Sequence, residues 1–255
     1  MITGVGIIAL VILLGVLSHR QSRFEERILK NVPLSDWFVG IIVPVLLYLG
    51  WFIIIRNISG RPSVDIFPLD DIDVLVLTIL FIVYGFVGNG MHFTSKIIGR
   101  YLKAGKHDKV YKVTEMFHGK FSHYLTHLNG LFIGFMLAIF EINHPLVYPL
   151  SRNYLLAIVT LGVILGLSAK RSVFYTNEWF GGFNKPIFYV ASLLDVVLFI
   201  ILKIFNMKIV FYSVYFFITV TFTSFIGTFV FRQIYIFMRL SEKRKLRFLA
   251  KIFSF

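Results

Sequence analysis

The sequence predicts an all-α, polytopic integral membrane protein with about seven transmembrane helices, its N-terminus outside and its C-terminus in the cytoplasm. Of its 255 residues 57% are hydrophobic, and the mean hydropathy is +0.80. A soluble domain is about 45–50% apolar. Seven apolar segments approach the roughly 20 residues needed to cross about 30 Å of hydrocarbon. Basic residues gather on alternate loops between these segments, which gives the orientation.

The apolar segments are predicted to be helices, because backbone polar groups in hydrocarbon must be paired within their own segment. Strands of a membrane barrel would be shorter and would alternate in polarity. The first segment lacks the basic leading region and cleavage site of a signal peptide and is predicted to be retained. Only Asn206-Met207-Lys208 separates the last two segments, so they form a tight helical hairpin. The predicted spans cover approximately residues 2–18, 37–56, 72–92, 122–142, 153–169, 186–205 and 209–231.

The distribution of basic residues predicts the orientation of the chain. The segments after the first, third, fifth and seventh spans carry 21 of the 26 Lys and Arg residues. The remaining five lie in the other segments: Arg56, Arg61, Arg152, Lys203 and Lys208. Basic residues concentrate in cytoplasmic loops, so the N-terminus is predicted outside. An even number of spans would break this alternation.

The chain divides into a transmembrane domain over residues 1–238 and a basic amphipathic tail over residues 239–255. The tail is predicted to dock on anionic lipid at the cytoplasmic surface. Residues 107–118 are predicted to form a second interfacial helix, with Val110, Val113 and Phe117 on one face. Gly119 is expected to end that helix and let the chain turn into the fourth span.

Composition excludes several classes of function. The absence of cysteine removes disulfides, thiolate zinc sites, iron–sulfur clusters and cysteine nucleophiles. The basic residues that give the net charge of +13 lie beside the spans, which indicates contact with anionic lipid and not with nucleic acid. No phosphate-binding glycine loop, GxSxG elbow or dinucleotide fingerprint occurs. No internal repeat supports an inverted-repeat transporter.

Histidines predict the functional site. Six of the seven fall on the predicted cytoplasmic side; His92 closes the third span, while His118, His123 and His127 surround the start of the fourth. Glu115 precedes His118 by three residues, and the last two histidines are four apart, so each pair shares a helical face. Such a set suits zinc, iron or manganese. The alternatives are haem ligation, and interfacial histidines that only snorkel or pair with lipid phosphates.

Two carboxylates are predicted to be catalytic. Asp195 lies near the middle of the sixth span, where a lone carboxylate costs about 2.5–3.5 kcal/mol. It is a candidate metal ligand, proton carrier or general base, with Asn129 or the histidines as partners. Its alternative role is a hydrogen bond that fixes helix packing. Glu178 lies in the aromatic and glycine-rich loop 175–185, whose alternative role is an interfacial anchor.

Two further features of the fourth span concern packing. Gly130 and Gly134 have the GxxxG spacing that lets another helix approach closely, so the histidine-bearing face is predicted to point into the bundle. Glu141 and His144 follow at the outer end, remote from the histidine cluster. They are predicted to form a local pair or part of a solvated loop.

The leading functional prediction is a metal-dependent enzyme that acts on a lipid or another amphiphile. A metal ion held by the histidines and Glu115 would activate water or oxygen at the interface while the substrate tail stays in the bundle. Hydrolysis, desaturation and hydroxylation all remain open. The second hypothesis is a small transporter or proton-coupled carrier that uses Asp195 and the histidines. The third is a haem-binding membrane electron carrier.

The predicted location is a cellular membrane, with membrane lipids as partners. A composition rich in Lys, Ile and Phe is typical of a low-GC prokaryote, in which the membrane would be the plasma membrane. Anionic lipid is expected at the basic cytoplasmic surface.

Overall fold

The computed structural model describes residues 1–18, 26–102, 109–173 and 184–253 and is almost wholly helical. Within these ranges the only strands are the antiparallel pair β1 (Ile28–Leu29) and β2 (Val32–Pro33). The helices are α1 (Ile2–Ser18), α3 (Leu34–Trp37), α4 (Val43–Ser59), α5 (Asp71–Tyr101), α6 (Lys109–Met116), α7 (Ser122–Ile142), α8 (Arg152–Val173), α9 (Asn184–Ile204), α10 (Ser213–Met238) and α11 (Glu242–Phe253). Two π turns, η1 (Phe38–Ile42) and η3 (Phe117–Phe121), join α3 to α4 and α6 to α7, and a 3₁₀ turn, η4 (Ile209–Phe211), precedes α10.

The all-α prediction is confirmed, and each predicted apolar segment contains a helix. Six helices in the described part of the chain are long and apolar enough to cross a membrane: Leu34–Ser59, Asp71–Tyr101, Lys109–Ile142, Arg152–Val173, Lys185–Ile204 and Ser213–Met238. The first predicted span, α1, is a shorter apolar helix of 17 residues. These lengths fit a multi-pass integral membrane protein.

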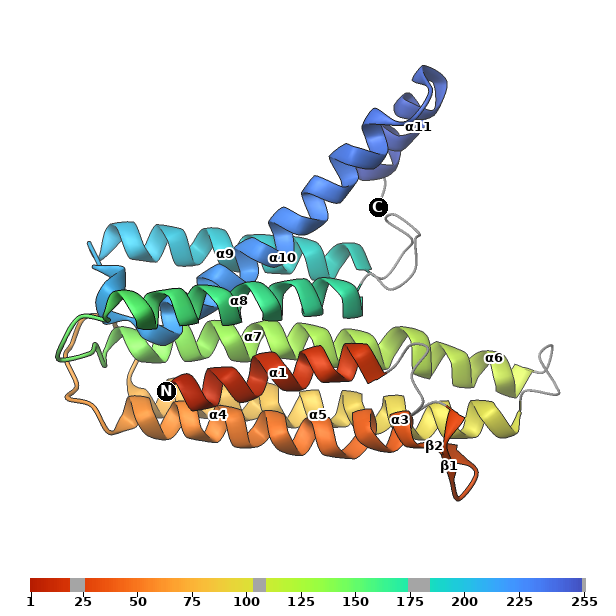
Figure 1. Ribbon diagram of the computed structural model, residues 1–255, viewed down its shortest axis with the longest axis horizontal. Coiled ribbons are helices and arrows are strands. Elements are labelled where there is room, and N and C mark those ends of the chain that lie inside the picture. The colour runs from red at the N-terminus through yellow and green to blue at the C-terminus, as the bar shows by residue number, and fades with distance from the viewer. Residues whose placement is uncertain (19–25, 103–108, 174–183, 254–255) are drawn as a thin grey trace.

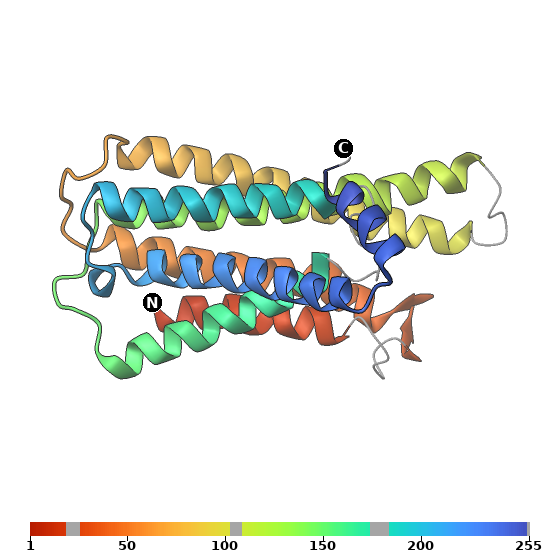
Figure 2. The same ribbon diagram turned by 90° about the horizontal axis from the view of Figure 1, so that it is seen from above.

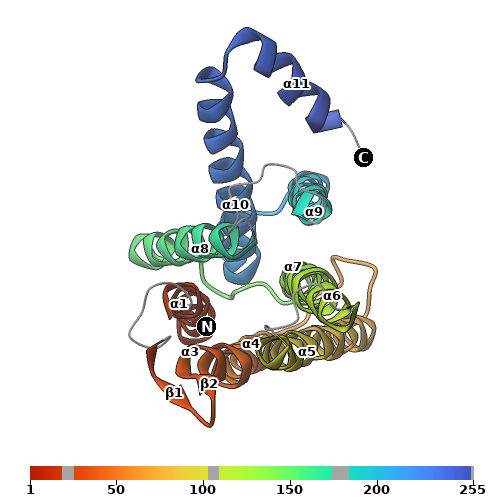
Figure 3. The same ribbon diagram turned by 90° about the vertical axis from the view of Figure 1, so that its right-hand side faces the viewer.

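The long helices lie side by side along a common axis (Figure 1). The N-terminus and segments 60–70, 143–151 and 205–212 lie at one end of the bundle, which we call the N-terminal end. Viewed down the axis, α1, α4 and α5 lie on one side and α8, α9 and α10 on the other, with α7 between (Figure 3). The second half of α10 leans away from the bundle, and α11 runs largely across its axis (Figures 2 and 3).

The hydrophobic core lies between these helices and includes the fully buried side chains of Ile54, Ile133, Ile158, Leu198 and Tyr215. Large apolar side chains on the outer faces are widely exposed, as expected where lipid replaces water as the solvent.

The closest packing between α8 and α10 depends on glycine. A Cβ atom on Gly166 would lie 2.6 Å from the carbonyl oxygen of Thr221, and one on Gly162 would also meet α10. The predicted close approach is wrong at Gly130, where no atom lies within 4 Å of the place of its Cβ atom. At Gly134 a Cβ atom would lie 3.2 Å from Cδ1 of Ile218 on α10. The GxxxG spacing that brings two helices together is therefore Gly162 to Gly166.

The predicted interfacial helix before the fourth span is wrong. Residues 109–142 form a continuous helix of 34 residues instead of a surface helix followed by a separate span. Gly119 lies inside the π turn η3 and does not end the helix. A π turn widens the helix by one residue without breaking its hydrogen bonding, and such turns are frequent at functional sites.

Glu141 joins three parts of the chain at the N-terminal end of the bundle. Its buried carboxylate lies 2.6 Å from the Arg61 guanidinium and accepts a hydrogen bond of 2.7 Å from the Ser213 hydroxyl. It also accepts the backbone N–H groups of Val214 and Tyr215 at 2.6 and 2.8 Å. These donors belong to the first turn of α10, where N–H groups have no partner within the helix. The carboxylate of α7 therefore caps α10.

His144 extends the same polar connection to α5. Its buried ring places Nε2 2.9 Å from a carboxylate oxygen of Asp71, the first residue of α5. Neighbouring Asn143 accepts the backbone N–H groups of Ile66 and Phe67. The prediction that residues 141–144 form a local pair or a solvated loop is wrong, since they connect α5, α7 and α10.

Candidate functional site

Four histidines meet at the end of the bundle opposite the N-terminal end. His92 lies on α5, His118 on the π turn η3, and His123 and His127 on α7. The ring centre of His92 lies 4.7 Å from that of His118 and 4.9 Å from that of His123. The rings of His118 and His123 are 6.1 Å apart, and those of His123 and His127 are 5.7 Å apart. We call these four side chains the histidine cluster.

The π turn explains how His118 reaches the cluster. Residues five apart in an α-helix point about 140° away from each other, because each residue turns the chain by about 100°. A π turn has an i to i+5 repeat, so residues five apart lie on the same side. His118 and His123 are five apart; His118 lies in the turn, and His123 follows its last residue by two positions. Convergence was predicted through a break at Gly119, whereas the structure achieves it by local widening.

Close packing of α5 against α7 brings His92 to the same place. A Cβ atom on Gly88 would lie 2.7 Å from the Cβ atom of Leu125 and 2.9 Å from the backbone nitrogen of Thr126. His92 follows Gly88 by one helical turn, so it faces α7. Its Nδ1 atom lies 3.4 Å from the Ser122 hydroxyl, which also donates to the carbonyl of residue 118. The sequence analysis did not single out Gly88.

The cluster lies about one hydrocarbon thickness from the N-terminal end of the bundle. From Asp71 to His92 the helix rises about 32 Å, and from Ile142 to His123 about 28 Å, at about 1.5 Å per residue. The hydrocarbon core of a bilayer is about 30 Å thick. If Asp71 and Ile142 lie at one boundary, the cluster lies at the other.

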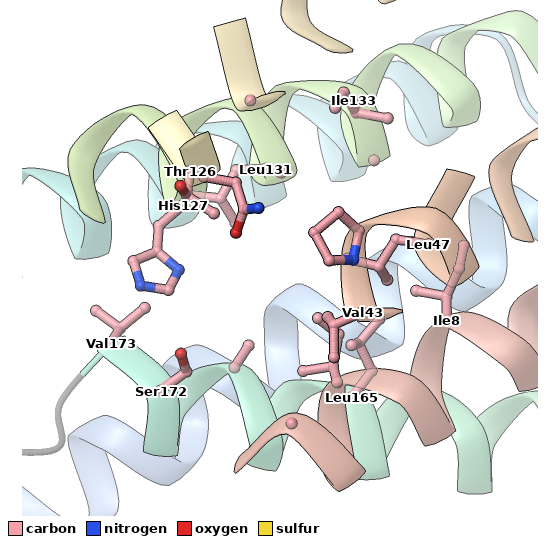
Figure 4. A pocket seen from close by; sticks show the side chains of 18 of the residues that line it. Ile8, Val43, Leu47, Thr126, His127, Leu131, Ile133, Leu165, Ser172 and Val173 are labelled. Atoms are coloured by element: carbon pink, nitrogen blue, oxygen red, sulfur yellow. The ribbon is translucent and has the colours of Figure 1, made fainter. Parts of the chain in front are cut away.

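A cavity of about 410 Å³ extends from the cluster into the bundle. Side chains from α1, η1, α4, α5, η3, α7, α8, α9 and α10 line it, and most of them are aliphatic or aromatic. In Figure 4 the His127 ring points from α7 toward Val173 of α8, while Ile8 and Leu47 lie deeper in the pocket. The cluster therefore forms the polar end of an apolar cavity.

Charged groups surround the cluster on its outer side. Asp36 is buried, with Lys96 Nζ 2.6 Å from one carboxylate oxygen and Arg100 2.5 Å from the other. The two basic residues are four apart on α5 and begin one turn beyond His92. The sequence analysis did not identify this network, although their spacing places both on one helical face. Glu115 lies 3.8 Å from His118, in the predicted i to i+3 arrangement.

The structure separates the second predicted group from the cluster. Asp195 on α9 is buried and accepts a hydrogen bond of 3.1 Å from the Thr223 hydroxyl of α10. It is not among the described residues that line the cavity. Asn129, its predicted partner, donates instead to the carbonyl of Leu125. Glu178 lies outside the described residues.

As the side chains stand, no three His, Asp or Glu residues in the described ranges form a set that could hold a metal ion. The arrangement supplies imidazole nitrogens that bind metals, donate hydrogen bonds or carry protons. No protein-family model, curated protein or solved structure matches the chain.

Proposed function

We propose that this chain is a seven-span membrane protein and a metal-dependent enzyme that acts on a membrane amphiphile. Its N-terminus lies outside and its histidine cluster near the cytoplasmic face. The observation that carries the proposal is the convergence of four imidazoles, from two neighbouring helices, at the polar end of an apolar cavity.

The topology is supported by the positions of helix ends and charges. Segments 60–70, 143–151 and 205–212 share the N-terminal end with the N-terminus, as alternation of seven spans requires. The segments that alternate with these along the sequence carry 21 of the 26 basic residues, which the positive-inside rule assigns to the cytoplasm. With 17 residues, α1 is about 25 Å long. That is enough to cross the bilayer where it is locally thinned, or with the ends of the crossing segment in the interface.

The spacing of the rings supports a bound ion. Imidazoles that bind one tetrahedral ion at about 2.0–2.1 Å have ring centres roughly 5 Å apart. The three contacts among His92, His118 and His123 measure 4.7, 4.9 and 6.1 Å. To bind one ion, the three rings would have to rotate about their side-chain bonds until a nitrogen of each faces the same point. Zinc, iron and manganese all accept such ligands.

Ring spacing favours a single ion over haem. Two axial imidazoles stand on opposite faces of a haem, with ring centres about 6 Å apart at the same metal–nitrogen distance. His92 and His123, the pair on facing helices, have centres only 4.9 Å apart. Transport coupled to Asp195 is also less supported, because that carboxylate accepts from Thr223 and is not among the described residues that line the cavity.

Neighbouring side chains would orient the ligands. Ser122 lies 3.4 Å from Nδ1 of His92, and Glu115 lies 3.8 Å from Nδ1 of His118. Partners of this kind hold a metal-binding imidazole in one tautomer and orientation. When bound, the ion would supply a Lewis acid at the polar end of the cavity. His92, His118 and His123 are its proposed ligands, with His127 and Glu115 as the further candidates.

The basic tail is proposed to rest on anionic lipid. Helix α11 carries Lys243, Arg244, Lys245 and Arg247 on exposed or half-exposed positions, and Leu246 is 73% exposed. Its axis lies largely across the bundle, the orientation of an amphipathic helix in the plane of a membrane interface (Figure 3).

Elemental analysis of detergent-purified protein tests the proposed metal site. The wild type should hold zinc, iron or manganese at a stoichiometric level, and His123→Ala should lose it. His144→Gln is the matched control, because it removes a buried histidine at the opposite end of α7 and should keep the ion. Wild-type protein without bound metal, even after each ion is supplied during expression and purification, would overturn the proposed metal site.

A further inference from the structure

We infer that the cavity binds one chain of an acidic amphiphile, with a carboxylate or phosphate head at the histidine cluster and an apolar tail deep in the bundle. This inference names the substrate class of the proposed enzyme. It rests on the proposed function only for the reaction of the head at the histidine cluster. Binding of the tail depends on the cavity alone.

The cavity is deep enough to hold a single lipid chain. Along α7 its lining residues extend from His123 to Leu137, which is about 21 Å at about 1.5 Å per residue. One leaflet of the hydrocarbon core, the depth of one lipid chain, is about 15 Å. The volume of about 410 Å³ also lies in the range of about 300–1,000 Å³ typical of small-molecule sites.

The side chains that line the deep part of the cavity favour an apolar tail. Ile8 and Ile12 of α1 face the cavity together with Leu47 and Trp51 of α4 and Leu137 of α7. These side chains offer almost no hydrogen-bonding groups, and a water molecule is stable in a cavity only with two to four polar partners. Tyr48 and Thr221 add hydroxyl groups to the lining, but most of the wall is apolar and suits an alkyl or isoprenyl chain.

The polar end selects an acidic head. It presents the four imidazoles, the Thr126 hydroxyl and the Asn89 amide, and Arg171 is the only charged residue among the described lining residues. No Asp or Glu lines the cavity within these residues. Guanidinium and imidazole groups form their strongest hydrogen bonds with carboxylate and phosphate oxygens. Arg171 is exposed at this end, where its guanidinium offers an acidic head a charged partner.

A substitution at Gly130 can fill part of the cavity. Gly130 lines it, and no atom lies within 4 Å of the place of its Cβ atom. The place of its Cβ atom is therefore open, and Gly130→Leu introduces a large side chain at the wall of the cavity. Gly90→Leu is the matched control, because Gly90 is, like Gly130, exposed and open at the place of its Cβ atom but does not line the cavity.

Photolabelling with a long-chain fatty acid that carries a diazirine in its tail tests the inference. The full chain is reconstituted in vesicles and irradiated. The labelled residues are then located by mass spectrometry. Labels on Leu47, Trp51 or Ile133 should saturate and fall at least tenfold with excess unlabelled fatty acid. Labels on outward-facing Val76 and Val83 should not saturate. Gly130→Leu should abolish the saturable labels, and Gly90→Leu should keep them.

Competitors identify the head. A fatty acid and an alkyl phosphate of equal chain length represent the two acidic sources, and at least one should compete. The corresponding fatty alcohol should compete at least tenfold more weakly, and Arg171→Gln should reduce this preference. Equal competition by the alcohol overturns the acidic head, and labelling that does not saturate overturns the cavity site. Metal content separates the two proposals, because Gly130→Leu should keep the ion that His123→Ala loses.

Discussion

Single polar side chains at the N-terminal end connect helices that are distant in the sequence. Glu141 is fully buried and satisfies a guanidinium, a hydroxyl and two backbone N–H groups. A buried charge of this kind is stable only when its hydrogen-bonding capacity is filled. Asp195 is also buried but has a simpler environment, with hydrogen bonds from one threonine. The two acids should therefore respond differently to loss of charge.

Glu141→Gln should destabilise the protein by about 3–5 kcal/mol, because it leaves the Arg61 charge buried without its partner. Reversible unfolding in mixed micelles measures the loss. Asp71→Asn is the control, since the Asp71 side chain is 43% exposed, and it should cost at most about 1 kcal/mol. Equal losses in the two variants would contradict the capping role of Glu141.

Asp195→Asn should keep bound metal and lower stability by at most about 1 kcal/mol, because the amide oxygen still accepts from Thr223. Thr223→Val should cost a similar amount. A double-mutant cycle over the two positions should show coupling between them. Loss of metal or turnover in Asp195→Asn, at unchanged stability, would show instead that this carboxylate acts in the site.

At the scale of elements, the π turn η3 and the glycine contact at Gly88 form the cluster together. The π turn brings His118 to the side of His123, and Gly88 lets α5 approach α7 so that His92 reaches both. The sequence places all of these residues near one boundary. It does not show the local widening, because a π turn has no composition that distinguishes it from ordinary helix.

Insertion of one alanine after Gly119 should rotate residues 109–118 by about 100° relative to α7. His118 would then leave the cluster, and the affinity for metal should fall at least tenfold in a chelator competition. Gly119→Ala should bind metal like the wild type, because no atom lies within 4 Å of the place of its Cβ atom. Unchanged affinity in the insertion variant would remove His118 from the proposed site.

At the scale of the whole molecule, polar side chains connect helices at each end of the bundle, and an apolar cavity lies between the two ends. Residues 141–144 connect α5, α7 and α10 at the N-terminal end, and Asp36 with Lys96 and Arg100 connects α3 to α5 at the other. Basic residues concentrate at the second end. This asymmetry is the basis of the proposed orientation.

The proposed topology predicts which single cysteines an impermeant maleimide reaches. The chain has no cysteine, so each introduced thiol is labelled without background. Thr3→Cys and Ser63→Cys should be labelled on intact cells, and Ser241→Cys only after permeabilisation. All three positions are exposed. Labelling of Thr3→Cys only after permeabilisation would show that α1 does not cross, and the reverse pattern at Ser63 and Ser241 would invert the orientation.

The sequence alone determined the helical class, the positions of the apolar helices and the gathering of histidines near one boundary. These properties depend on the lipid solvent. Backbone polar groups in hydrocarbon must form hydrogen bonds within their own segment, and the thickness of the hydrocarbon core sets the length and spacing of the segments. The meeting of His92, His118 and His123 was also foreseeable from their shared depth.

Only the tertiary structure decided how side chains from different helices pair. Glu141 was predicted to lie in a local pair or a solvated loop, and Asp36 drew no prediction, yet each is buried against partners at least 60 residues away. Asp195 is paired with Thr223 and does not join the cluster, because rotation of each helix about its own axis decides which face meets which neighbour. Lipid is as apolar as the side chains it surrounds, so hydrophobicity does not set this rotation, whereas close packing and polar pairing do.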